Sequence, residues 1–157
     1  MTSADHVHQV LKDAEATVAT AESLTGGQLA SQLTNVPGSS QTYGGGAVTY
    51  WTSLKIALLG VPEALVQEYG VVSAECAESM ATGVRDVAGT TYGLATTGVA
   101  GPDEQEGKPV GTVFVGVAGP SGARSIQLNL DGERADIQAQ TCAAALELLA
   151  DEVSVRE

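Results

Sequence analysis

Apolar residues recur every three to four positions near the start of the chain, which predicts an amphipathic helix over about the first dozen residues. They are Val7, Val10, Leu11 and Ala14. A short buried strand is predicted over residues 17–22, followed by a helix over residues 25–34. Residues 35–46, NVPGSSQTYGGG, contain many turn formers and three consecutive glycines, so this segment is predicted to be a loop.

The middle of the chain continues the alternation of strands and helices. A second strand is predicted over residues 47–51, and the short helix that follows it contains Lys55. Another short helix is predicted over residues 62–69, because a proline suits a helix start. Ser73 is the expected N-cap of a longer helix that runs to about residue 87.

The last third of the chain contains a hairpin and a long helix. A third strand, over residues 92–97, ends in TTGVAGP. Two strand-like runs, 110–117 and 124–130, flank the turn sequence AGPSGA, which predicts an antiparallel hairpin. A final helix is predicted over residues 134–152. Together these elements predict a single α/β domain over residues 1–157, a three-layer α/β/α sandwich with a mixed sheet.

The composition limits the kinds of partner. The 157 residues include 19 acidic and 7 basic side chains, which gives a formal net charge of −12. Nucleic-acid affinity depends on Lys and Arg displacing counterions, so this charge argues against binding to DNA or RNA. The chain has no run of about 18 apolar residues, and its start, MTSADHVHQVLKD, does not match a signal peptide. We therefore expect a cytoplasmic protein without a membrane segment.

Neither the cysteines nor the histidines show the spacing of a metal site. Cys76 and Cys142 are isolated, without a CxxC motif, so buried reduced thiols are expected rather than metal ligands or a redox pair. His6 and His8 lie two positions apart in the first predicted helix and would point to different sides of it. They are expected at the surface, and no metal or cofactor is predicted.

Polar segments that contain glycine follow three of the predicted strands. They are ESLTGG at 22–27, TYWTSLK at 49–55 and TTGVAGPDEQEGKPVG at 96–111. In open α/β sheets, ligands bind beyond the carboxyl ends of strands, where loops and helix N-termini offer free N–H groups. These three segments are therefore the candidates for a functional site.

Ser23 stands at the predicted junction between a strand and a helix, where its hydroxyl can face a pocket. The helix dipole favours developing negative charge there, which suits a nucleophile. The alternative interpretation is that Ser23 or Thr25 caps the helix, while Gly26 and Gly27 allow the helix to pack closely on the sheet. Spacing alone leaves both interpretations open.

A serine nucleophile needs a base, because its hydroxyl is hardly ionised at neutral pH. Lys55 is the best candidate, since burial can lower the pKa of a lysine enough for it to act as a base, and Ser–Lys pairs are a known variant of the catalytic triad. The alternative is an exposed helix lysine. Glu22 can orient Lys55 or a substrate amide, or it can stabilise a helix start. Neither a GxSxG nor an SxxK motif occurs.

Hydroxyls and glycines after the third predicted strand suggest a site for an anion. Thr96, Thr97, Gly98 and Gly101 offer hydroxyl and N–H groups that can hold a phosphate or an oxyanion. Arg134, in LDGERADI, can clamp a phosphate with two hydrogen bonds or form a surface ion pair. Neither GxxxxGK[ST] nor GxGxxG is present, so the usual modes of nucleoside-triphosphate and dinucleotide binding have little support.

Six stretches, in consistent order from about residue 5 to residue 150, resemble the carboxy-terminal domain of the competence/damage-inducible protein CinA. They are TVATAESLTGG, AVTY-x4-K-x3-LGV, YGVVSAECAESMATGV, LATTGVAGP, KPVGTVFVGV and LDGERADIQAQT. That family includes stand-alone nicotinamide-nucleotide amidohydrolases, also called NMN deamidases. The resemblance implies hydrolysis of the carboxamide of nicotinamide mononucleotide to nicotinate mononucleotide and ammonia, without a metal or cofactor.

The resemblance also implies roles for individual residues. The family's nucleophilic serine falls on Ser23, its tyrosine and lysine on Tyr50 and Lys55, its TGxAGP threonine on Thr97 and its arginine on Arg134. Lys55 would accept the serine proton and Tyr50 would position that exchange, while N–H groups after Ser23, with Thr97, would stabilise the oxyanion. Arg134 and the remaining glycine-rich backbone would bind the ribose phosphate. The residues expected to bind substrate beside Arg134 are Glu22, Thr25, Gly26, Gly27, Thr96, Gly98 and Gly101.

This sequence departs from the family pattern in three places. WTS at 51–53 stands where Ser-Asn is common, DEQEG at 103–107 stands in place of a Gly-Gly pair, and Gln138 replaces a frequent arginine. The last two weaken the case for phosphate binding and leave the nucleophile and base intact. Two alternatives stay open: an amidohydrolase acting on another small amide or ester, and a non-catalytic regulatory or partner-binding module. A homodimer is expected, because small cytoplasmic enzymes often form closed symmetric assemblies.

Overall fold

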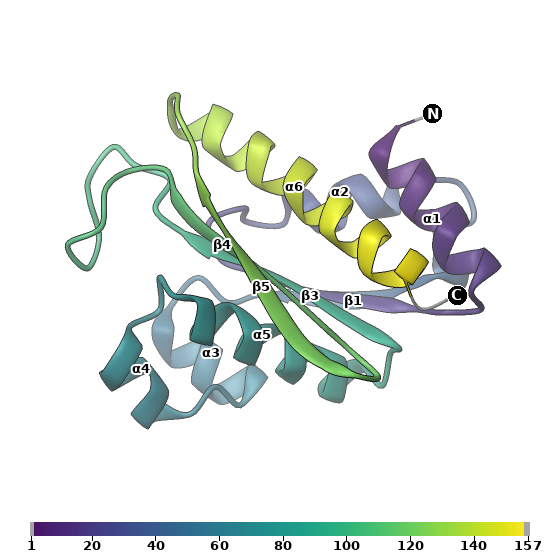
Figure 1. The fold of residues 1–157 in the computed structure, drawn as a ribbon, viewed down its shortest axis with the longest axis horizontal. Helices are drawn as coiled ribbons and strands as arrows, with labels where there is room; N and C mark the ends of the chain where they lie inside the picture. The colour runs from purple at the N-terminus through teal and green to yellow at the C-terminus, as the bar shows by residue number, and fades with distance from the viewer. Residues whose placement is uncertain (1, 156–157) are drawn as a thin grey trace.

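A five-stranded sheet separates two layers of helices in the computed structural model, which describes residues 2–155 (Figure 1). The strands are β1 (Val18–Glu22), β2 (Tyr43–Val48), β3 (Tyr92–Gly98), β4 (Thr112–Gly119) and β5 (Gly122–Asn129). Their order is β2-β1-β3-β4-β5, with β1 parallel to β2 and β3, and β4 antiparallel to β3 and β5. The prediction of a three-layer α/β/α sandwich with a mixed sheet is confirmed.

Helices cover both faces of the sheet (Figure 1). One layer contains α1 (Ser3–Asp13), α2 (Gln28–Thr34) and α6 (Arg134–Val155). The other contains α3 (Thr52–Leu59), α4 (Glu63–Tyr69) and α5 (Ala74–Ala88). Successive strand residues enter opposite cores: Val18 packs with the α1, α2 and α6 layer, and Ala19 packs with the other layer. This period of two explains why all five residues of β1 are buried.

The second strand does not lie where the sequence predicts it. It spans Tyr43–Val48 rather than residues 47–51, and a short 3₁₀ helix, η1 (Ser39–Gln41), precedes it. The glycines that suggested a loop are strand residues, because the backbone of β2 passes very close to β1. A Cβ at Gly46 would lie 2.3 Å from Thr20 Oγ1 and 2.6 Å from the Thr20 carbonyl oxygen. Glycine is required there by the close approach of another strand.

The other predicted elements are present, with ends that differ by a few residues. Ser73 is the N-cap of α5, as predicted, and its hydroxyl accepts a hydrogen bond of 3.1 Å from the Cys76 amide. Both cysteines are buried free thiols, as predicted. Burial raises the pKa of Cys76 to about 11 and that of Cys142 to about 12, so both thiols stay protonated at neutral pH.

The surface features of residues 2–155 add little to the functional picture. His6 is exposed, whereas His8 is half-buried, with its Nδ1 atom 2.7 Å from Thr42 Oγ1. Across these residues, no three His, Cys, Asp or Glu side chains gather to hold a metal ion. None of the helices in the described part of the chain has both the length and the apolar character needed to cross a membrane.

Candidate active site

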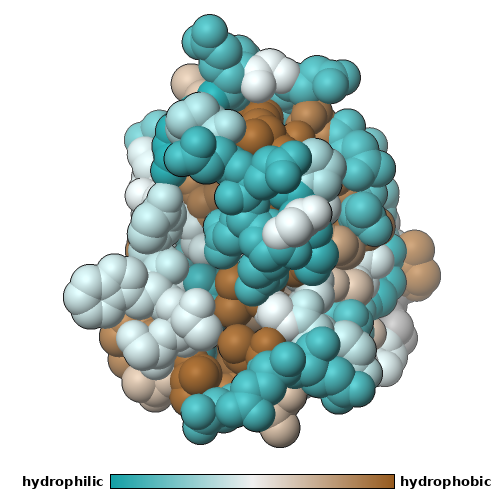
Figure 2. Space-filling view, turned by 90° about the vertical axis from the view of Figure 1, so that its left-hand side faces the viewer, coloured by the Kyte–Doolittle hydropathy of each residue, from teal (hydrophilic) through white to brown (hydrophobic). Residues whose placement is uncertain are grey.

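A pocket of about 640 Å³ lies at the edge of the sheet where β1, β2 and β3 end. This is the left-hand edge in Figure 1, and Figure 2 faces it, with hydrophilic residues over the middle of that end and hydrophobic ones showing between them. Parallel strands place their carboxyl ends together, so the segments after β1, β2 and β3 all reach the pocket. The start of α6 and the segment before α5 complete its walls.

The pocket contains a direct contact between Ser23 and Lys55. The Lys55 ammonium donates a hydrogen bond of 3.0 Å to Ser23 Oγ. Ser23 directly follows β1 and is half-buried, while Lys55 lies in the first turn of α3 and is only 1% exposed. The two residues are 32 positions apart, and the parallel pairing of β1 and β2 brings the loops that carry them to the same edge. Lys55 is therefore a buried residue, and the alternative of an exposed helix lysine is wrong.

Burial shifts the Lys55 amine toward its neutral form, relative to an exposed lysine. Burial lowers its pKa from the ordinary value of 10.5, against smaller opposing effects of Cys76 and Glu106. The Lys55 Nζ atom also donates to the carbonyl oxygens of Thr49, at 2.6 Å, and Tyr50, at 3.5 Å. A neutral amine has two N–H donors and one lone pair, so these carbonyls can take both donors while the lone pair faces Ser23 Oγ. This is the geometry that a general base needs.

Glu22 shapes the turn that presents Ser23. Its carboxylate is 1% exposed and accepts hydrogen bonds from the Thr25 hydroxyl at 2.6 Å and from the amides of Gly27, Leu29 and Ala30 at 3.2, 2.9 and 3.0 Å. Glu22 thus binds the first amides of α2 from outside the helix. Of the two predicted roles, stabilising the helix start is the one that this geometry supports, since its contacts are with residues 25–30 rather than with Lys55.

The polar run after β1 is a turn, and the helix begins later than predicted. Gly26 and Gly27 take φ values of +56° and +99°, which favour glycine, and α2 starts at Gln28 instead of residue 25. Gly27 occupies the N-cap position, which has no side-chain hydrogen bond. The interpretation of Ser23 or Thr25 as the helix cap is therefore wrong. The turn leaves the Ser23 hydroxyl facing Lys55.

Two groups near Ser23 bear on how an oxyanion would be held. Within residues 2–155, the amide of Leu24 finds no hydrogen-bond acceptor, and Leu24 lines the pocket, so this amide is available as a donor. The Thr97 hydroxyl, in contrast, donates a 2.7 Å hydrogen bond to the carbonyl of Val71. Its proton is committed to the pocket wall, so the predicted use of the Thr97 hydroxyl as an oxyanion donor does not fit this geometry.

Arg134 joins two walls of the pocket. Its Nη1 atom donates to the Gly101 carbonyl at 2.5 Å, and its Nη2 atom donates to the Tyr50 hydroxyl at 2.7 Å. Both partners are neutral, so the positive charge of Arg134 is not cancelled by a carboxylate in these contacts. Arg134 is exposed, and an anionic group of a ligand at the mouth of the pocket can approach it.

The structure brings together seven of the twelve predicted site residues. The residues that line the pocket are Ser23, Tyr50, Lys55, Thr97, Gly98, Gly101 and Arg134. The other five stand behind it and support the turn after β1. They are Glu22, Thr25, Gly26, Gly27 and Thr96. Thr25 Oγ1, for example, lies 2.8 Å from Thr96 Oγ1, so these hydroxyls tie β1 to β3 rather than face a ligand.

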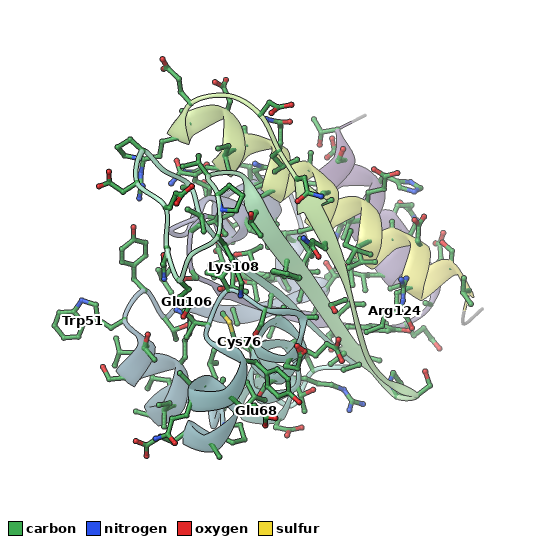
Figure 3. All side chains as sticks on the ribbon, turned by 60° about the vertical axis from the view of Figure 1, so that its left-hand side comes forward. Trp51, Glu68, Cys76, Glu106, Lys108 and Arg124 are labelled. Atoms are coloured by element: carbon green, nitrogen blue, oxygen red, sulfur yellow. The ribbon has the colours of Figure 1, made fainter. Side chains whose placement is uncertain are left out.

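Several pocket residues were not predicted from the sequence. Val71 comes from the segment before α5, and Trp51, which is 71% exposed, projects away from the body of the molecule beside the pocket (Figure 3). Asp103, Glu104 and Gln105 add acidic and polar side chains from the β3–β4 loop. Trp51 and the loop lie within the candidate segments 49–55 and 96–111, but no individual role was predicted for these residues. Val71 had no signal in its residue type.

The fold and the pocket define a three-layer α/β protein with a serine next to a buried lysine at the carboxyl edge of its sheet. The model of the CinA C-terminal domain matches residues 1–153. The chain belongs to the CinA C-terminal domain family, as its sequence motifs indicate.

Curated relatives of this chain are longer proteins. It is 50% identical over 140 residues to a CinA-like protein of Frankia casuarinae, covering 89% of this chain and 32% of the relative. It is 47% identical over 133 residues to a putative competence-damage inducible protein of Streptococcus agalactiae, covering 84% of this chain and 32% of that protein. The chain therefore spans about a third of the length of these relatives.

Solved structures of similar length share the fold. A competence/damage inducible protein of Agrobacterium tumefaciens is 32% identical, with a TM-score of 0.88 over 97% of this chain and 95% of that one. A CinA superfamily protein of Escherichia coli is 31% identical, with a TM-score of 0.90 over 95% of this chain and 90% of that one. None of these names states an enzymatic activity, so a proposal about activity must rest on the chemistry of the site.

Proposed function

We propose that the protein is a serine amidohydrolase that converts nicotinamide mononucleotide to nicotinate mononucleotide and ammonia. The observation that carries this proposal is the 3.0 Å contact between Lys55 Nζ and Ser23 Oγ inside a pocket large enough for a small molecule. Burying a lysine beside a serine costs folding free energy, since burial penalises the charge, and groups of this kind cluster at functional sites. The family resemblance supplies the substrate.

In the acylation step, neutral Lys55 accepts the Ser23 proton while Ser23 Oγ attacks the carboxamide carbon. The carbonyl oxygen becomes an oxyanion, to which the Leu24 amide can donate; a donor of this kind contributes about 3 kcal/mol to the transition state. When the tetrahedral intermediate collapses, the C–N bond breaks. Protonated Lys55 gives its proton to the leaving nitrogen, which departs as ammonia and leaves an acyl ester on Ser23.

In the second step, water attacks the ester carbon while Lys55 accepts the water proton. Collapse of this intermediate breaks the bond to Ser23 Oγ and returns the proton to it. The products are the carboxylic acid and the free enzyme, so atoms and protons balance without a cofactor. The carbonyls of Thr49 and Tyr50 hold the Lys55 Nζ atom in place through both steps.

A second candidate is an amidohydrolase that acts on a related amide without a phosphate. The pocket lining supports keeping this candidate, because Asp103 and Glu104 bring negative charge to a wall where a phosphate group would prefer positive charge. Arg134 is the cationic group at the mouth that can compensate for them. The charge of the substrate is thus the main question within the amidohydrolase class.

The proposal is tested by incubating the purified protein with nicotinamide mononucleotide, nicotinamide riboside and nicotinamide in parallel. Ammonia and the matching carboxylic acid are measured together, and they are expected in equal amounts from the mononucleotide. Turnover of the riboside alone would favour the second candidate. Absence of turnover on all three amides, from folded protein, would favour a non-catalytic binding module instead.

Replacement of Arg134 by Gln is expected to raise KM for nicotinamide mononucleotide about tenfold or more, because a charge-assisted hydrogen bond contributes about 1.5–3 kcal/mol. KM for the riboside is expected to change much less. Arg124→Gln is the matched control, since Arg124 pairs with Glu152 at a site remote from the pocket (Figure 3). An equal rise in KM for both substrates would mean that Arg134 acts by holding the walls formed by Tyr50 and Gly101, not by contacting phosphate.

A further inference from the structure

Glu106 fastens the loop between β3 and β4 onto the segment before α5. Its carboxylate accepts hydrogen bonds of 3.0 Å from the Val71 amide and 2.9 Å from the Val72 amide. Lys108, from the same loop, donates to the Val72 carbonyl, and its Nζ atom lies 4.0 Å from the Glu106 carboxylate. Figure 3 shows Glu106 and Lys108 side by side near Cys76 of α5. Residues 71–72 are therefore held by two side chains of the loop: Glu106 accepts from their amides, and Lys108 donates to the Val72 carbonyl.

The local conformation of the loop is built to present this carboxylate. Lys108 N donates to Gln105 O at 2.9 Å and Gln105 N donates to Lys108 O at 3.3 Å, which closes a two-residue turn at Glu106 and Gly107. Both turn residues have positive φ, 55° and 73°, as a type I′ turn requires. A glutamate in this region is uncommon and is disfavoured relative to glycine, so its side-chain contacts must offset that cost.

The segment that Glu106 binds has room for its carboxylate because residue 70 is a glycine. A Cβ at Gly70 would lie 2.5 Å from Glu106 Oε1, and Gly70 itself has a φ of +77°. Any larger residue at this position would displace the carboxylate. The turn at Glu106 and the glycine at position 70 thus both favour the contact between the loop and residues 70–72.

This contact reaches the wall of the pocket through two short paths. Val71 lines the pocket, and its carbonyl accepts the 2.7 Å hydrogen bond from the hydroxyl of Thr97, which lines the pocket as well. Gln105, directly before Glu106, lines it from the loop side. Fixing Val71 therefore fixes the position of the Thr97 side chain and of the adjoining loop wall.

We propose that Glu106 is a positioning residue for the pocket of the Ser23–Lys55 pair: its carboxylate locks the β3–β4 loop to Val71 and Val72 and so holds the wall of that pocket in place. This inference rests on the proposed serine amidohydrolase function and adds a residue to it. The titratable groups that act on Lys55 from the elements packed around it are Cys76 of α5 and Glu106 of the loop. Cys76 is protonated at neutral pH, so Glu106 supplies the negative charge.

The direction of the electrostatic effect follows from the sign of that charge. The Glu106 carboxylate favours the protonated form of Lys55 and so raises the pKa of Lys55, partly opposing the effect of burial. Removing the charge in Glu106→Gln is expected to lower the pKa of Lys55 further. The acidic limb of the profile of kcat/KM against pH is then expected to move to lower pH.

The experiment compares Glu106→Gln, Glu106→Ala and Glu68→Gln with the wild type. Glu68 is an exposed carboxylate of α4, so its replacement changes the net charge equally without touching the loop (Figure 3). In Glu106→Ala, hydrogen exchange of the Val71 and Val72 amides is expected to become at least tenfold faster, and KM is expected to rise several-fold. In Glu106→Gln, the acidic limb shifts to lower pH. Glu68→Gln should match the wild type in all three measurements.

The outcomes separate this inference from the proposed function. A fall in kcat alone, with KM, the acidic limb and amide exchange unchanged, would mean that Glu106 has no positioning role and would overturn the inference. If the wild type hydrolyses none of the amides, the pH dependence of Ser23 labelling by a fluorophosphonate probe replaces the kinetic limb. A shift of that dependence in Glu106→Gln, with faster exchange in Glu106→Ala, would support the inference although the proposed function had failed.

Discussion

Ser23→Ala is expected to lower kcat for amide hydrolysis by about 10⁴-fold or more, because removing a nucleophile removes the covalent route altogether. The reason is geometric: the Ser23 hydroxyl lies 3.0 Å from a buried amine whose pKa is lowered, and the replacement leaves that amine without its partner. The fold should be unaffected, since Ser23 is half-buried and the turn around it is held by Glu22. Initial rates of ammonia release, with thermal unfolding as the check on folding, measure the effect.

The matched control for this variant is Ser31→Ala, which removes a serine hydroxyl from an exposed position of α2. It should retain wild-type rates. A fluorophosphonate probe should add its mass to the wild type and to Ser31→Ala, and not to Ser23→Ala. If Ser23→Ala keeps a substantial part of the activity, Ser23 is not the nucleophile, and direct attack by a water molecule that Lys55 deprotonates becomes the better mechanism.

The Ser23–Lys55 pair could be predicted from the sequence because it follows from two regularities of α/β folds. Parallel strands bring their carboxyl ends to one edge of a sheet, and Ser23 and Lys55 each follow a predicted strand closely. Small errors in the elements did not matter. The strand β2 ends at Val48 instead of residue 51, yet the segment after it still carries Lys55 to the same edge.

The contacts that support the pair could not be predicted from the sequence, because they depend on neighbours in the tertiary structure. Glu22 reads as an acid near a helix start, but nothing in the residue types shows that its carboxylate would bind the amide of the N-cap Gly27 and two amides of α2. The glycines of β2 read as a loop because the close approach of Thr20 is invisible in a single sequence. Glu106 lies in a loop that was noted only because DEQEG replaces a Gly-Gly pair of the family pattern. Its contact with Val71 and Val72 joins positions about 35 residues apart.

Replacing Lys55 separates its role as a base from its role in packing. Lys55→Arg is expected to lower kcat about 10³-fold or more, because an arginine stays protonated at every accessible pH and cannot accept the serine proton. Lys55→Met keeps a similar length without a titratable group and is expected to be equally inactive. In the wild type, kcat/KM is expected to rise with pH up to the pKa of Lys55, which burial holds below 10.5. Any activity that remains in Lys55→Met should lack this limb.

The lowered pKa of Lys55 must also affect how the free energy of unfolding depends on pH, which provides an independent test. Because burial lowers the pKa of Lys55 in the folded state, the unfolded chain keeps the proton between that pKa and 10.5. The penalty for burying the charge is present in full below the folded pKa and is relieved as pH rises through it. The free energy of unfolding of the wild type, relative to Lys55→Met, should therefore increase with pH up to about 10.5. Taking the difference between the two proteins removes the titration of groups that behave alike in both, such as Tyr43 and Cys142.

The decisive test is whether the pH dependence of kcat/KM agrees with the pH dependence of the relative stability. If Lys55 is the base, the midpoint of the kinetic limb and the pH at which the relative stability begins to rise coincide, since one proton on one amine governs both. Urea unfolding of the wild type and Lys55→Met at a series of pH values, beside kcat/KM at the same values, makes the comparison. A kinetic limb well away from the rise in relative stability would assign the limb to another group or to the substrate. Lys55 would then be a buried partner that orients Ser23, with the proton taken elsewhere.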